Sequence, residues 1–242
     1  GIVSNNMIDP RRPALRFSLG DARQARDPFW WDEAEPLWVT AERAGIRTAT
    51  MFWPGSNVPW GGTKASSWPY AITGGTRPSD WAQFNQAISG AQRVNMVLDV
   101  LRRPADIRPT FVTLYFDIVD TAGHIYGPDA PETTKALADV DGHIGDLVAG
   151  LKAMGQPANL VIVADHGMAA SSSERVVALD KVADSANYRV VESGPYATLA
   201  AVPGREKALE AALLKPHAHM QCWRKGGIPA RFHYGTHQRI PP

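Results

Sequence analysis

The chain has 242 residues, of which 44% are hydrophobic and 20% are charged, and its formal net charge is +1. This composition is typical of a folded globular protein and excludes a disordered chain. Because basic and acidic residues are interspersed and nearly equal in number, binding to long nucleic acid is not favoured. No apolar run approaches the roughly 20 residues that cross a bilayer, so no membrane span is predicted.

The first third of the chain predicts an irregular start followed by alternating helix and strand. Residues 1–36 are rich in Arg, Pro and Asp and are expected to be irregular. A helix is predicted over 36–45 and a strand over 46–53, which is closed by a Pro-Gly pair. Residues 57–78, dense in Gly, Pro, Ser and Trp, predict a long loop of the kind that often carries function.

The next helix is predicted to begin at Asp80, whose carboxylate can cap it, and to run to about Leu101. Its apolar face includes Val94 and Val97. The apolar, β-branched run over 110–118 then predicts a buried strand.

The clearest amphipathic helix covers 137–151, and a second apolar run over 159–163 predicts another strand. A strand, a helix and a strand in this order form a right-handed crossover, so the carboxyl ends of both strands emerge at one edge. Strands over 188–191 and 196–202 and a helix over 205–214 follow. The sequence therefore predicts an α/β fold with a mostly parallel sheet flanked by helices.

Two pairs of aspartate and histidine stand where the two buried strands are expected to end. Asp120 pairs with His124, and Asp165 pairs with His166. Gly123 is expected to let a loop fold back, so that the first pair reaches one ion. Carboxylate and imidazole suit zinc or a similar transition ion, and two pairs at one sheet edge predict a two-metal site. Each residue taken singly would more simply be a hydrogen-bonded structural residue.

The motifs around these pairs resemble the nucleotide pyrophosphatase/phosphodiesterase family of the alkaline phosphatase superfamily. The resemblance rests on the run Leu114-Tyr-Phe-Asp-Ile-Val-Asp-Thr-Ala-Gly-His-Ile-Tyr-Gly-Pro128 and on Asp165-His-Gly-Met168. Three further segments agree, at 1–10, 52–56 and 233–242. The resemblance implies an alkaline-phosphatase-like three-layer core that is incomplete in this chain.

The resemblance also implies that residues 1–242 are the middle of one truncated catalytic domain, with an insertion or subdomain around 175–235. In that family a metal-binding Asp and the threonine nucleophile precede the segment matched at Gly1, and a third histidine follows the segment matched at Pro242. His237 belongs to the upstream segment and is not expected to be that histidine. We therefore expect this chain by itself to be inactive, with partial or no metal occupancy.

Carried over to this sequence, the resemblance assigns each Asp/His pair to one of two Zn²⁺ ions and gives Asn5 the role of donating to a phosphoryl oxygen. Tyr115 matches an aromatic residue that stacks on the nucleobase. Phe84 is expected to be a second wall, and Trp53 to line the same cleft. The alternatives from the residues alone are a turn for Asn5, helix core for Phe84 and simple packing for Trp53.

The expected function is a metal-dependent phosphodiesterase that splits nucleotide phosphodiester or pyrophosphate bonds and releases nucleoside monophosphates. Its substrate would be a small nucleotide or dinucleotide. The alternatives are a lipid phosphodiesterase that accepts a choline-type head group, and an inactive folded core. The family resemblance implies a periplasmic or secreted parent protein. A sheet edge left open in the chain would favour a homodimer.

Overall fold

The computed structural model describes residues 4–194 and 196–240, and the chain forms two compact units. One unit combines Gly1–Ala25 with Ser172–Pro242, and the other is Arg26–Ser171. The segment around 175–235 thus shares a unit with the first residues of the chain. That residues 1–242 act as one catalytic domain stays a prediction.

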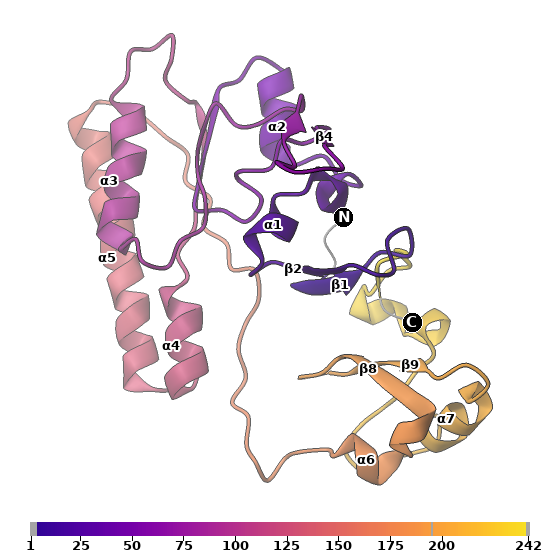
Figure 1. The fold of residues 1–242 in the computed structure, drawn as a ribbon. Helices are drawn as coiled ribbons and strands as arrows, with labels where there is room; N and C mark the ends of the chain where they lie inside the picture. The colour runs from indigo at the N-terminus through magenta and orange to yellow at the C-terminus, as the bar shows by residue number, and fades with distance from the viewer. Residues whose placement is uncertain (1–3, 195, 241–242) are drawn as a thin grey trace. The chain divides into compact units, whose positions relative to one another are not determined.

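The unit formed by Arg26–Ser171 is built on a parallel sheet of three strands in the order β6-β3-β7. The strands are β3 (Thr48–Met51), β6 (Asp80–Ala82) and β7 (Phe111–Leu114) (Figure 1). Every residue of β3 is buried, as expected for the central strand of a parallel sheet. The strands predicted over 46–53 and 110–118 are confirmed, in shorter form. Because β6 and β7 are the outer strands, the predicted dimerisation through a sheet edge stays a prediction.

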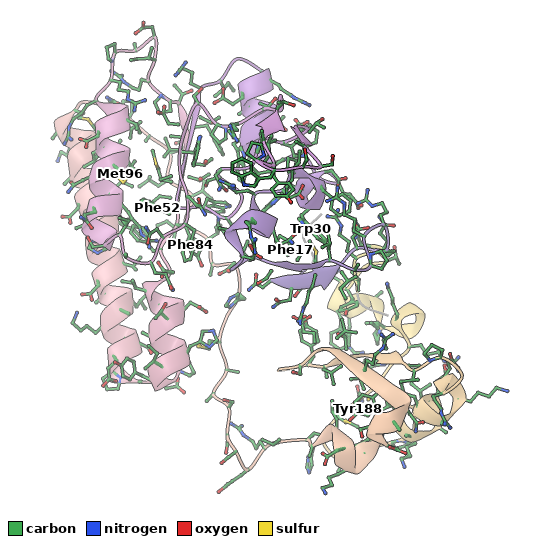
Figure 2. The ribbon with its side chains drawn as sticks, in the orientation of Figure 1. Phe17, Trp30, Phe52, Phe84, Met96 and Tyr188 are labelled. Carbon is green, nitrogen blue, oxygen red and sulfur yellow. The ribbon has the colours of Figure 1, made fainter. Side chains whose placement is uncertain are left out.

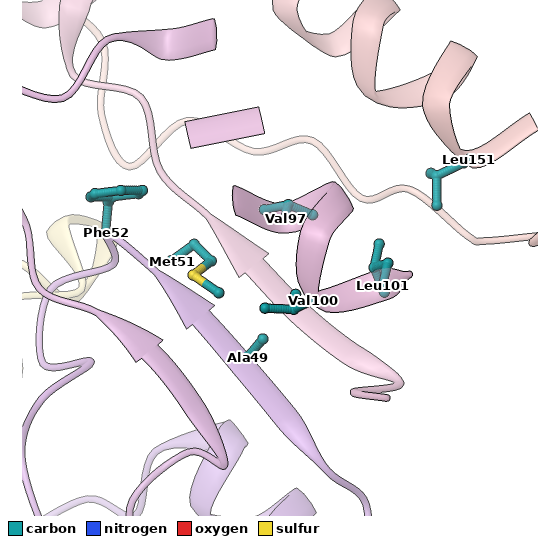
Figure 3. Packing of buried hydrophobic residues seen from close by; sticks show 7 residues of the cluster. All are labelled: Ala49, Met51, Phe52, Val97, Val100, Leu101 and Leu151. Atoms are coloured by element: carbon teal, nitrogen blue, oxygen red, sulfur yellow. The ribbon is translucent and has the colours of Figure 1, made fainter. Parts of the chain in front are cut away.

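Helices flank this sheet, which confirms the α/β class. Helices α2 (Leu37–Arg43) and α3 (Gly90–Leu101) contact its strands, α5 (Pro131–Ala153) packs on α3, and α4 (Ile118–Tyr126) packs on α5. Helices α3 and α5 lie side by side (Figure 1). The hydrophobic core lies where α3 meets the central strand and α5, and Figure 3 shows its members: Ala49, Met51, Phe52, Val97, Val100, Leu101 and Leu151.

The prediction that Asp80 caps a helix is wrong. Asp80 begins β6, which hydrogen-bonds along β3, and its carboxylate pairs with Arg103 at 2.6 Å. Helix α3 begins ten residues later with a capping box, in which the amide of Gln92 donates to Ser89 Oγ at 3.3 Å and the amide of Ser89 donates to Gln92 Oε1 at 3.0 Å. The reciprocal cap satisfies two backbone amides at once, whereas the carboxylate of Asp80 is paired with Arg103.

Replacing Ser89 by alanine is expected to destabilise the Arg26–Ser171 unit by about 1 kcal/mol, because one capping acceptor is lost. Urea denaturation followed by the amide exchange of α3 measures this loss. Ser89→Asp retains an acceptor and serves as the control. Equal stability of the alanine and aspartate variants would contradict the capping role.

The strand predicted over 159–163 is absent from the sheets of the described residues. The run has no regular secondary structure, and Val161 and Ile162 are 85% and 71% exposed. An apolar β-branched run favours a strand only when a neighbouring strand supplies hydrogen bonds, and none of the described strands does so here. The predicted crossover is therefore incomplete, although its helix, α5, is confirmed.

The long loop predicted over 57–78 contains a small hairpin of β4 (Thr63–Lys64) and β5 (Ile72–Thr73). The turn that leads into this loop packs against Trp31. Gly55 has φ of 82° and lies against Trp31, where a Cβ would come within 2.6 Å of a ring carbon. The Pro-Gly pair after β3 therefore serves both a left-handed turn and a close aromatic contact.

The other unit contains two antiparallel hairpins, in place of the wholly irregular start predicted over 1–36. The first pairs β1 (Asn6–Ile8) with β2 (Arg16–Ser18), and the second pairs β8 (Tyr188–Glu192) with β9 (Thr198–Ala201). Helix α7 (Glu206–Leu213) confirms the last predicted helix. Pro195, between these two strands, lies outside the described residues. The remaining short elements of this unit are α1 (Ala22–Ala25), α6 (Leu179–Val182), η2 (Ser185–Asn187), η3 (Lys225–Gly227) and η4 (Ala230–Phe232), whereas η1 (Pro28–Trp31) belongs to the Arg26–Ser171 unit.

A buried ion pair joins the two ends of this unit. Arg239 Nε donates to Asp9 Oδ2 at 2.5 Å, and both side chains are fully buried. Arg11 also donates to both oxygens of Asp9, at 3.0 and 2.8 Å. These bonds, those from Arg11 foremost and those from Arg239 next, hold the pKa of Asp9 far below its usual value.

Candidate metal centre and aromatic wall

Asp120 and His124 lie on a helix and not in the loop that the sequence predicted. The chain enters α4 soon after β7 ends, and residues four apart on a helix share one face. His124 Nε2 accordingly lies 3.5 Å from Asp120 Oδ1. Gly123 is buried inside the helix, and a Cβ there would come within 2.4 Å of Met168 Sδ. Its small size therefore admits Met168, and no loop folds back at this point.

The contact with Met168 brings the second Asp/His pair next to α4. His166 Nε2 lies 3.5 Å from Asp165 Oδ2 and 3.9 Å from Asp120 Oδ1. His166 Nδ1 is 2.9 Å from the carbonyl oxygen of Gly167, and this hydrogen bond, followed by the field of Asp165, raises the pKa of His166. Both histidines thus lie within 4 Å of Asp120, and Asp165 contacts His166, without the strand expected over 159–163.

Asp120 offers the strongest indication that a cation fits here. Its Oδ1 atom is buried and accepts no hydrogen bond from the described part of the chain, a costly state for a carboxylate oxygen. Two ligand atoms each about 2.1 Å from a tetrahedral zinc lie roughly 3.4 Å apart. The 3.5 Å separations of both Asp/His pairs match that spacing. Within residues 4–194 and 196–240, no group of three or more His, Cys, Asp or Glu side chains is placed to hold a metal ion, so the fit is limited to the two pairs.

Three aromatic side chains follow the three parallel strands and meet one another. Trp53 comes two residues after β3, Phe84 two after β6, and Tyr115 directly after β7. The ring of Tyr115 lies 6.2 Å from that of Trp53 and 5.8 Å from that of Phe84, both edge to face. Phe84 precedes α3 and is 40% exposed, so the helix-core alternative for it is wrong. We call Trp53, Phe84 and Tyr115 the aromatic wall.

The aromatic wall adjoins the Asp/His cluster. Burial raises the pKa of the Tyr115 hydroxyl first, and the charges of Asp165, Asp120 and Asp117 raise it further. The ring with its hydroxyl is therefore within the electrostatic reach of both candidate metal pairs. This edge, at the carboxyl ends of parallel strands, is where open α/β sheets bind their ligands.

Arg93 is the residue at this edge that the sequence analysis missed. It lies in the first turn of α3 and is only 2% exposed, and its guanidinium forms a 2.7 Å ion pair with Asp117. The sequence did contain a signal for Arg93, namely a charged residue on the apolar face of a predicted helix, one turn before Val97. A charged residue in that place must be paired when it is buried.

Asn5 belongs to the unit that contains the two hairpins, where it is exposed and its carbonyl accepts a hydrogen bond from the amide of Leu19 at 3.0 Å. Its predicted contact with a phosphoryl oxygen stays a prediction.

The sheet, its flanking helices and the acidic, histidine-bearing edge define a hydrolase-like α/β domain, and comparison with known proteins identifies its class. The family model "Type I phosphodiesterase / nucleotide pyrophosphatase" matches residues 1–242. The chain belongs to this family of hydrolases, which bears out the resemblance seen in its motifs.

Individual relatives agree. The chain is 34% identical over 245 residues to a bis(5'-adenosyl)-triphosphatase of Xenopus laevis and covers 50% of that protein. It is 34% identical over 254 residues to the human ectonucleotide pyrophosphatase/phosphodiesterase family member 1 and covers 26% of it. Both alignments include the whole of this chain.

A structural likeness supports the fold. Murine ectonucleotide pyrophosphatase/phosphodiesterase 5 matches all of this chain with a TM-score of 0.85 and 30% identity, and the match covers 61% of the murine chain. An inactive variant of the murine protein, solved in complex with AMP, gives the same TM-score. The chain therefore spans about half the length of the relatives it resembles, or less. Among the helices described, none combines the length and the apolar character needed to cross a membrane.

Proposed function

We propose that this chain carries the base-binding and part of the metal-binding surface of a phosphodiesterase or nucleotide pyrophosphatase. The whole protein would hydrolyse nucleotide phosphodiester or pyrophosphate bonds to nucleoside monophosphates. The observation that carries the proposal is the aromatic wall beside the Asp120 cluster. A flat base stacks on aromatic rings, while its phosphate needs positive charge nearby, and this edge offers a place for both.

In this proposal Asp120 and His124 hold one zinc ion, and Asp165 and His166 hold the other. Two bound zinc ions would supply charge stabilisation at the phosphoryl oxygens, activation of the attacking oxygen and assistance to the leaving group. Asn5 would donate its amide to a phosphoryl oxygen. The rings of Tyr115, Phe84 and Trp53 would hold the base without reading its edge, so that different bases are accepted.

For the chain by itself we propose negligible turnover, because none of the threonines in residues 1–242 matches the nucleophile in the family resemblance. Zinc-dependent hydrolysis of a nucleotide ester by the 242-residue chain would refute this proposal. A periplasmic or secreted location of the whole protein is proposed because its relatives are described as ectonucleotide enzymes.

Binding of AMP to the zinc-loaded chain, measured by isothermal titration calorimetry, tests the base-binding surface. Tyr115→Ala is expected to weaken AMP binding about tenfold or more, since stacking of one base on one ring contributes roughly 1–3 kcal/mol. Tyr126→Ala is a matched control. Tyr126 is an exposed residue of α4. Two residues correspond to about 200° around a helix, so its ring lies on a different face from His124. Equal losses in both variants, or a failure of the parent chain to bind AMP, would refute the proposal.

The alternative substrate is a choline-type lipid phosphodiester, because aromatic rings also bind quaternary ammonium groups. Phosphocholine in place of AMP separates the two substrates in the same titration. We expect AMP to bind more tightly than phosphocholine, and the Tyr115→Ala change to affect AMP binding. Tighter binding of phosphocholine would favour the lipid substrate.

A further inference from the structure

Arg93 is a buried cation that contacts the aromatic wall and the residue immediately before α4. Its Nη1 donates to the carbonyl of Tyr115 at 2.8 Å, its Nη2 to the carbonyl of Asn85 at 3.0 Å, and its Nε to the carbonyl of Ile88 at 3.0 Å. Nη2 also lies 2.7 Å from Asp117 Oδ1. One guanidinium thus binds the segment that leaves β6 and the segment that joins β7 to α4.

The same guanidinium also lies on aromatic rings. Its central carbon is 4.8 Å from the ring centroid of Phe52 and 5.9 Å from that of Phe84. Figure 2 labels these two phenylalanines. Phe52 has φ of 62°, a left-handed conformation that is uncommon for an aromatic residue, and its neighbour Trp53 belongs to the wall. All three segments that carry the aromatic wall therefore meet at the Arg93 side chain.

These contacts are hard to explain by stability alone. Burying a guanidinium costs desolvation energy, and apolar side chains of similar volume often replace buried ion pairs without loss of stability. Arg93 instead makes its bonds to carbonyls and a carboxylate at the ends of strands, on the edge that carries the candidate site. A planar group with five N–H donors in fixed directions determines the spacing of such acceptors better than an apolar side chain does.

We propose that Arg93 is a positioning residue that sets the aromatic wall at a fixed place relative to α4 and its Asp120 and His124. It binds the backbone of Tyr115 on the wall side and the side chain of Asp117 immediately before α4. Asp117 makes no capping hydrogen bond with its side chain, and its Oδ1 lies 2.7 Å from Arg93 Nη2 as an ion pair. The inference rests on the proposed function for the ligands of the aromatic wall and of the Asp/His residues. The contacts of Arg93 do not depend on that function.

The test compares Arg93→Lys with Val97→Ala, one turn further along the same helix. Lysine keeps the charge, but its single nitrogen cannot reach the carbonyls of Tyr115, Asn85 and Ile88 together. Val97→Ala opens a cavity in the core of the same unit and leaves the Arg93 contacts in place. Asp117→Asn is a second, milder variant that removes the ion pair without changing side-chain size. Global stability of each variant is measured by urea denaturation, so that variants are compared at equal stability.

The first readout needs no ligand. Hydrogen exchange of the Thr121 amide, which donates to the carbonyl of Asp117 at 3.0 Å, reports on the first turn of α4. After correction for global stability, we expect this amide to exchange at least tenfold faster in Arg93→Lys and detectably faster in Asp117→Asn. In Val97→Ala it should exchange at the parental rate. Equal exchange rates in Arg93→Lys and Val97→Ala would overturn the positioning role, whatever the chain binds.

The second readout is the affinity of the zinc-loaded chain for AMP. We expect Arg93→Lys to bind AMP at least tenfold more weakly than the parent chain, and Val97→Ala to bind it equally well. Parental AMP affinity in Arg93→Lys would overturn the proposed link between Arg93 and the wall. If the parent chain itself binds no AMP, the proposed function fails, while the Thr121 exchange still decides whether Arg93 positions α4.

Discussion

Replacing Asp120 by asparagine is expected to weaken the binding of Zn²⁺ to this chain by at least ~100-fold. Asp120 Oδ1 is the atom that both His124 and His166 approach, and it is buried without a hydrogen-bond donor in the described residues. An amide oxygen carries no net charge, so the variant loses most of the attraction for a divalent cation. Competition with a chromophoric chelator measures the affinity.

Asp139→Asn is the matched control for this measurement. Asp139 is an exposed aspartate of α5 whose carboxylate pairs with Lys135 at 2.6 Å, one helical turn away. We expect Asp139→Asn to leave Zn²⁺ binding unchanged. If Asp120→Asn and Asp139→Asn bind Zn²⁺ with the same affinity as the parent chain, Asp120 is not a ligand, and its orphaned oxygen needs another explanation.

Replacing Arg239 by methionine is expected to destabilise the unit that holds the two hairpins by about 3–5 kcal/mol. Arg239 and Asp9 are both fully buried, so removing the arginine leaves a buried carboxylate with fewer donors. Hydrogen exchange of the β8–β9 amides as a function of urea concentration measures the loss. The control is Arg224→Met. Arg224 forms an exposed pair with Glu210, and we expect no measurable change from its removal.

The same pair predicts a dependence of stability on pH. Because the pKa of Asp9 is lower in the folded chain than its ordinary value of 3.8, the stabilisation is fully present above that value. It is lost as the pH falls through the lower pKa of the folded state. Arg11 still lowers the pKa of Asp9 in Arg239→Met, so the stability difference between the parent chain and this variant should shrink only at acid pH, below the pKa that Asp9 has in the variant. A difference that widens as the pH falls would contradict the ionised pair.

Local patterns predicted the elements whose stability is mainly local. The apolar spacing over 137–151 identified α5, and the run over 110–118 contains β7, because the apolar pattern of a buried helix face or strand can be read from consecutive residues. The capping role predicted for Asp80 was wrong for the opposite reason. Its place in β6 depends on hydrogen bonds to β3, thirty residues earlier, and a cap signal cannot report such a pairing.

The sequence identified side chains that contact one another, but not the backbone that carries them, and the roles of these side chains stay predictions. His124 and His166 both approach Asp120, and Trp53 and Phe84 both approach Tyr115. However, α4 replaces the expected loop, and none of the described strands leads into Asp165. Motif spacing fixes which side chains can meet, whereas the backbone that brings them together depends on packing such as that of Met168 on Gly123. Arg93 was missed because a buried charge is recognisable only once its partners are known.

The pairing of Asp9 with Arg239 has a consequence for how the chain folds during its synthesis. The two residues are 230 positions apart, so the hairpin of β1 and β2 has emerged from the ribosome long before its charged partner is made. Contacts of such high sequence separation form slowly. In the interval Met7 and Phe17, both buried in the finished unit, lack residues 172–242 of that unit, while Arg26–Ser171 can already fold. The early hairpin is therefore the segment that a chaperone would most usefully protect.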